Sequence, residues 1–112
     1  MDMDVQELPN GVTKVALKGR IDIAAAGQAE TKFSAIAGHR RAVVVDLSQV
    51  DFLASMGIRM LLLTAKTVQA KGGKMVLLGA SAPIAGVLKT ARIDSLIPLH
   101  DTLAAATAAV GG

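Results

Sequence analysis

The feature that most constrains the fold is the run Ala42-Val43-Val44-Val45, a short, mostly β-branched segment with polar residues on both sides. Such an uninterrupted apolar run is typical of a strand buried on both faces, which needs covering layers above and below its sheet. A second buried strand is predicted from Lys74 to Leu78. Between the two, residues 56–70 have the periodicity of an amphipathic helix. This order predicts a parallel βαβ unit and an α/β fold.

The remaining segments extend this unit at both ends. Asn10-Gly11 suits the tight turn of a hairpin between strands at 3–8 and 12–18. Other expected elements are a helix over 24–37, a loop over 47–54 after Asp46 ends its strand, a third helix capped by Ser81, a strand over 96–99 and a last helix from Asp101. We therefore predict a single domain, residues 1–112, with a four- or five-stranded mixed sheet and about four helices.

Composition argues against several classes of protein. The chain has no cysteine, which removes disulfides and thiolate metal sites. Its start is acidic where a signal peptide needs a basic region, and no stretch reaches the ~18 apolar residues of a membrane span. The net charge is +3, but Arg40-Arg41 is the only basic pair and the other Lys and Arg are scattered along the chain. We expect a cytoplasmic protein with no membrane insertion and no direct contact with nucleic acid.

No group of residues has the pattern of a catalytic centre. His39 and His100 are far apart in sequence, and neither has the setting of a catalytic triad. Lys71-Gly72-Gly73-Lys74 lacks the spacing of a phosphate-binding loop and follows a helix instead of opening one. Asp46 and Asp51 lack a third metal ligand. We therefore expect no catalytic residue, no metal site and no cofactor, and predict that the protein is not an enzyme.

The helix over 56–70 carries apolar residues on two faces. One face has the spacing of a core stripe: Ile58, Leu61, Leu62, Ala65 and Val68. The opposite face carries Met56, Met60 and Leu63 and begins directly after Ser55, whose hydroxyl is expected to cap the helix. This second stripe is either covered by another element or exposed as an adaptable binding patch. The nearby Arg59 and Lys66 favour exposure and a partner surface.

Three segments together resemble a known family. Gly19 to Asp22, Val43 to Ser48 and Phe52 to Ile58 look like the STAS domain of anti-sigma factor antagonists, and the likeness covers essentially the whole chain. The resemblance implies that an anti-sigma factor, itself a serine kinase, binds the unmodified protein and so frees a sigma factor. It implies further that this kinase phosphorylates Ser55, which ends the binding, and that a phosphatase resets the switch. The ATP belongs to the kinase.

The resemblance and the second stripe together give the predicted site. The expected partner-binding residues are Asp22, Ala54, Ser55, Met56, Gly57, Arg59, Met60 and Leu63. Ala54 and Met56 depart from the acid and the small hydroxyl residue that family members often carry, whereas Ser55 and Gly57 are kept. The alternative function is a constitutive accessory subunit of a transporter, for instance in lipid transport, with Ser55 only a helix cap. In either case we expect a monomer or a weak dimer.

Overall fold

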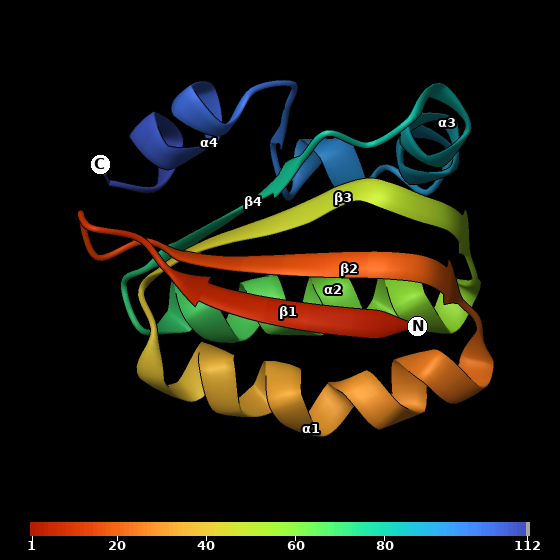
Figure 1. Ribbon diagram of the computed structural model, residues 1–112, viewed down its shortest axis with the longest axis horizontal. Coiled ribbons are helices and arrows are strands. Elements are labelled where there is room, and N and C mark those ends of the chain that lie inside the picture. The colour runs from red at the N-terminus through yellow and green to blue at the C-terminus, as the bar shows by residue number, and fades with distance from the viewer. Residues whose placement is uncertain (112) are drawn as a thin grey trace.

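The protein is built on one five-stranded sheet in the order β1-β2-β3-β4-β5, shown in Figure 1 by a computed structural model that describes residues 1–111. The strands are β1 (Asp2–Glu7), β2 (Thr13–Ile21), β3 (Ala42–Leu53), β4 (Lys74–Leu78) and β5 (Leu99–His100). The hairpin pair β1 and β2 is antiparallel, and every later pairing is parallel. The predicted α/β class and mixed sheet are confirmed.

Helices cover the two faces of the sheet unequally. They are α1 (Ile23–His39), α2 (Ser55–Ala70), α3 (Ala82–Thr90), the short 3-10 helix η1 (Ile93–Ser95) and α4 (Leu103–Val110). In Figure 1, α1 and α2 lie side by side below the sheet, whereas α4 lies above it at the left and α3 at the right. The carboxyl ends of β2 and β3 therefore lead into the first turns of α1 and α2 at one end of the molecule.

Two apolar clusters lie on the two faces of the sheet. The larger one lies between the sheet and helices α1 and α2, with Phe33 and Leu61 fully buried, and it also includes Ile84 and Leu88 of α3. The smaller one lies under α4 and contains Val44 and Val76. Val43, Val44 and Val45 alternate between the two clusters, as successive side chains of a strand must. The prediction that this run is buried on both faces is confirmed.

The predicted end of β3 at Asp46 is wrong. The strand continues to Leu53 because it stays paired with β2, with Ile21 opposite Leu53, through two register shifts. The Asp46 side chain still binds the following backbone, accepting a hydrogen bond from the Ser48 N–H at 2.9 Å, and it pairs with Lys14 at 3.6 Å. Asp46 therefore forms the local hydrogen bond expected of a turn residue, but the strand does not end there because its pairing with β2 continues.

The other boundaries differ by smaller amounts. Gly11 has the positive φ, 81°, that the predicted hairpin turn needs. Ser81 is the N-cap residue of α3, although its side chain makes no capping hydrogen bond. The last strand is shorter and later than predicted, because the N–H groups of Leu96 and Ile97 both donate to the Ile93 carbonyl and so continue the turn that follows η1. Helix α4 begins at Leu103, capped by Thr102.

Candidate functional site

Ser55 is the first residue of α2 and is exposed to solvent. The N-cap position belongs to Ala54, which has extended backbone angles (φ −76°, ψ 162°) and offers no side-chain acceptor. The prediction that the Ser55 hydroxyl caps the helix is wrong, because Ser55 already lies inside the first turn. Free N–H groups at a helix start carry a partial positive charge. The first turn of α2 therefore presents an exposed hydroxyl beside N–H groups that no side chain caps.

Two contacts fix this turn on the end of the sheet. The Ala54 N–H donates to the Ile21 carbonyl at 2.8 Å, which ties the start of α2 to the end of β2. Gly57 is buried, and a Cβ there would lie 2.7 Å from Leu53 Cδ1 and 2.8 Å from Ile21 Cγ2. Only a residue without a side chain fits, so Gly57 lets α2 approach the sheet closely. The position of Ser55 follows from this approach.

Asp22 lies at the same end of the molecule and caps α1. Its carboxylate accepts a hydrogen bond from the Ala25 N–H at 2.8 Å. Because β2 and β3 are parallel and adjacent, the two helix starts emerge from the same edge of the sheet. The structure thus brings Asp22 and Ser55 to one end of the fold, and Asp22 has a helix-capping role that was not predicted from the sequence.

The second apolar stripe of α2 is partly exposed and partly covered. Met56 and Leu63 are 48% and 44% exposed, as predicted, but Met60 is only 5% exposed. The expected exposure of Met60 is wrong because α1 packs beside α2 and covers it. The two helices leave a hollow of about 200 Å³ between them, which we call the α1–α2 groove. It is lined by Ile23, Ala26, Gly27, Glu30, Met56, Arg59, Met60 and Leu63.

Two exposed apolar residues at this end, Ile23 and Phe52, were not predicted from the sequence. Ile23 is 70% exposed, the most exposed of the large apolar side chains. Asp22 could have indicated this position, because an N-cap at Asp22 makes Ile23 the first residue of α1 and places it near the start of α2. Phe52 is also exposed, and the Arg20 guanidinium lies 4.3 Å from the centre of its ring. Isolated exposed apolar residues are common, but several at one end indicate a contact surface.

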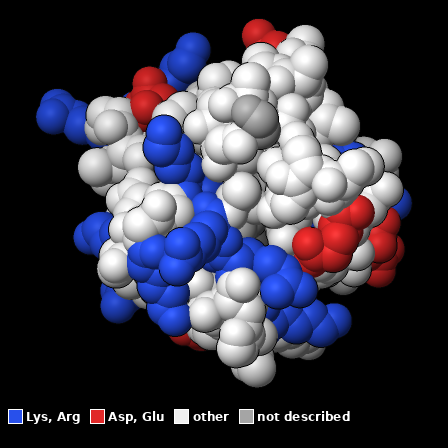
Figure 2. Space-filling view, turned by 90° about the vertical axis from the view of Figure 1, so that its left-hand side faces the viewer, with Lys and Arg blue, Asp and Glu red and all other residues white. Residues whose placement is uncertain are grey.

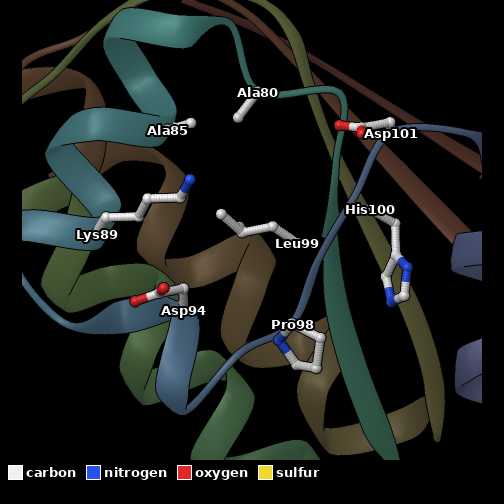
Figure 3. Close-up of a pocket in the computed structure, with 8 residues that line it drawn as sticks. All are labelled: Ala80, Ala85, Lys89, Asp94, Pro98, Leu99, His100 and Asp101. Atoms are coloured by element: carbon white, nitrogen blue, oxygen red, sulfur yellow. The ribbon is translucent and has the colours of Figure 1, made fainter.

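The β4–β5 edge of the sheet, beside α3, holds a separate hollow of about 460 Å³ (Figure 3). Leu99 and Lys89 point toward one another across it, whereas the His100 imidazole lies on the other side of its strand. The His100 Nε2 atom is buried without a hydrogen-bond partner among residues 1–111. In that same range, no three His, Asp or Glu side chains come together as metal ligands, and no helix is long and apolar enough to cross a membrane.

The fold and the site define a small α/β domain that presents a serine beside an apolar groove, at the edge where two parallel strands lead into helices. The STAS domain family matches residues 3–106, and the chain belongs to this family. The resemblance inferred from the sequence is thereby confirmed.

Named relatives are anti-sigma factor antagonists. The anti-sigma-F factor antagonist RsfB of Mycobacterium tuberculosis is 36% identical over 104 residues, which cover 84% of this chain and 80% of RsfB. The crystal structure of an anti-sigma factor antagonist from Mycobacterium paratuberculosis superimposes with a TM-score of 0.87 and 29% identity, covering 99% of this chain and 94% of that one.

More distant structures share the fold. SpoIIAA superimposes in its phosphorylated form (TM-score 0.74, 19% identity) and in its unphosphorylated form (TM-score 0.79, 18% identity), over 94% of this chain in each case. The STAS domain of a SulP transporter from Vibrio cholerae superimposes with a TM-score of 0.71 and 25% identity, covering 91% of this chain and 82% of that one. The family therefore includes both antagonists and transporter domains.

Proposed function

We propose that this protein is an anti-sigma factor antagonist that acts by binding, not by catalysis, and that phosphorylation of Ser55 ends the binding. The observation that carries the proposal is the placement of an exposed serine at the uncapped start of α2, beside the α1–α2 groove and the exposed Met56. The names of the relatives supply the partner class, an anti-sigma factor.

The physical chemistry of the helix start makes the switch workable. A phosphate adds about −1.5 to −2 charge units at neutral pH. The N–H groups and dipole of the uncapped first turn favour a negative charge, so the domain keeps its fold. A partner packed on Met56 would have to strip water from that charge. A loss of about 3 kcal/mol in binding free energy weakens the complex more than a hundredfold.

The remaining steps of the switch lie in the partners. An anti-sigma factor with serine kinase activity would use its own ATP to modify Ser55, and a phosphatase would restore the binding form. Binding of the unmodified protein would release a sigma factor from its inhibitor. This role needs no cofactor in the chain itself, and it places the protein in the cytoplasm with its kinase.

Affinity capture from the native cell extract tests the proposal. Wild type and Ser55→Ala should each retain an anti-sigma kinase, identified by mass spectrometry, and Ser55→Asp should lose it. Ser81→Asp is the matched control, because it places the same charge at the start of α3, where Ser81 is exposed and forms no capping bond. Equal recovery by Ser55→Asp and wild type contradicts the switch, as does an unchanged protein mass after treatment with the kinase and ATP.

The likeness to the SulP transporter domain supports a second candidate, a constitutive accessory subunit of a transporter. In that role the groove would be a permanent interface, and the charge at residue 55 would not control binding. Recovery of transporter subunits by wild type and Ser55→Asp alike would establish this function in place of the first.

A further inference from the structure

The excess positive charge of the protein gathers at the end opposite Ser55. Arg40 and Arg41 come from the turn between α1 and β3, Lys71 comes from the turn between α2 and β4, and Lys74 is the first residue of β4. Figure 2 shows Lys and Arg side chains in a continuous band over this end, which lies at the left in Figure 1. We call these four residues the basic pole. The expectation that basic residues outside the Arg40-Arg41 pair are scattered is wrong here, because the fold joins two distant turns.

The basic pole accounts for the net charge of the chain. Within residues 1–111, the one carboxylate paired with it is Glu7, whose Oε1 lies 3.0 Å from Arg40 Nε. The chain has 12 Lys and Arg against 9 Asp and Glu. The pole contributes four of the 12 basic residues and Glu7 is one of the 9 acidic residues, so eight basic and eight acidic residues remain elsewhere. The net charge of +3 is therefore local, and it gives this end a directional electrostatic field.

Backbone contacts hold the two turns together. The Lys74 N–H donates to the Arg41 carbonyl at 2.7 Å, and Gly73 packs against the Arg41 backbone so closely that no Cβ would fit. Lys71 Nζ donates to the Gly38 carbonyl at 2.9 Å near the end of α1. These contacts border a hollow of about 510 Å³, lined by Gly38, His39, Arg40, Arg41 and Lys71. The charges therefore sit on a fixed frame around a recess.

Stabilisation of the helix ends explains only part of this cluster. Basic side chains near helix C-termini offset the negative end of the helix dipole, and Lys71 does so by binding a terminal carbonyl. Arg41 and Lys74 lie beyond the helices, and neither forms an ion pair within residues 1–111. Their charge is available to a ligand.

The contact between α1 and α2 links the pole to the Ser55 end. A second hollow, of about 120 Å³, shares Glu30, Met60 and Leu63 with the α1–α2 groove and reaches Ala37, the residue before Gly38. The 16 residues of α2 span about 24 Å at 1.5 Å per residue. A single elongated segment of a partner could therefore run from Met56 to Arg41.

We propose that the basic pole binds an acidic stretch of the same protein partner whose apolar part occupies the α1–α2 groove. The identity of that partner rests on the proposed function, whereas the acidic chemistry rests on the charge of the pole. Arg and Lys donors pair well with carboxylates. Single-stranded nucleic acid would also need aromatic stacking platforms. Phe33 is buried and Phe52 lies at the opposite end, so the pole offers none.

An NMR titration of the full ¹⁵N-labelled chain with hexaglutamate peptide tests the acidic chemistry without the partner. We expect amide shifts confined to residues 38–41 and 71–74. The variant Arg41→Gln/Lys74→Gln should lower the affinity for the peptide about five- to tenfold, as expected for the loss of two exposed ion pairs. The control variant Lys18→Gln/Lys89→Gln removes the same amount of charge outside the pole and should leave the affinity for hexaglutamate unchanged. Equal affinity of the two double variants, or shifts centred elsewhere, would overturn the proposal.

Two comparisons separate this inference from others. Tighter binding of an oligonucleotide or of phosphatidylserine vesicles at the pole would overturn the acidic-peptide assignment. With a recovered anti-sigma factor, loss of binding in Ser55→Asp but full binding in Arg41→Gln/Lys74→Gln at low salt would refute this inference and leave the proposed function standing. Hexaglutamate binding at the pole without recovery of an anti-sigma factor would refute the proposed function and leave the acidic ligand class standing.

Discussion

Replacing Gly57 by alanine adds one methyl group where the start of α2 touches the sheet. The new Cβ would lie 2.7 Å from Leu53 Cδ1 and 2.8 Å from Ile21 Cγ2. Ile21 is fully buried and β-branched, so its side chain has little freedom to turn away. Overpacking of this kind costs about 1–3 kcal/mol, and alanine returns up to about 1 kcal/mol in a helix. We expect Gly57→Ala to lower the free energy of unfolding by about 1–2 kcal/mol.

Gly27→Ala is the matched control for this change. Gly27 lies within α1, and a Cβ there would meet nothing within 4 Å, so only the gain in helix propensity remains. Thermal unfolding of both variants measures the difference, at about 4–8 °C per kcal/mol for a domain near this size. Gly57→Ala should melt below wild type and Gly27→Ala slightly above it. If both variants melt above wild type, close packing at Gly57 does not position the start of α2.

Two further predictions concern the acid stability and the groove. Arg40 donates a hydrogen bond that lowers the pKa of Glu7 below its ordinary value of 4.5, and the buried Thr13 hydroxyl adds another. A carboxyl group whose pKa is lowered in the folded state stabilises the fold at pH values above its ordinary pKa. This stabilisation is lost as the pH falls below about 4.5. Urea unfolding should therefore show Glu7→Gln less stable than wild type at pH 7 and nearly equal to it at pH 3; a constant difference contradicts the role of Glu7. Ile23→Ser should weaken anti-sigma factor binding about five- to thirtyfold by calorimetry while stability stays within about 0.5 kcal/mol, and the exposed Leu96→Ser should bind normally. Normal binding by Ile23→Ser would exclude Ile23 from the interface.

Local patterns in the sequence determined the elements and their order. The β-branched run from Val43 to Val45 predicted a strand buried on both faces, and Asn10-Gly11 predicted a tight turn; the structure has both. Lys74 to Leu78 forms a strand with the predicted bounds. Such features depend on neighbouring residues alone, so a sequence shows them directly. The start of α2 was likewise predicted from local pattern: the expected first residue was Met56, and the helix begins at Ser55.

Only the tertiary structure decided which faces are covered and which distant residues meet. Met60 lies on the outward face of its own helix, but α1 covers it, and the periodicity of one helix cannot report where another will pack. β3 passes Asp46 because pairing with β2 continues to Leu53. The basic pole exists because Arg41 and Lys74, far apart in sequence, lie at the starts of the adjacent parallel strands β3 and β4. Periodicity describes one element at a time, whereas covered faces and shared surfaces arise from contacts between elements.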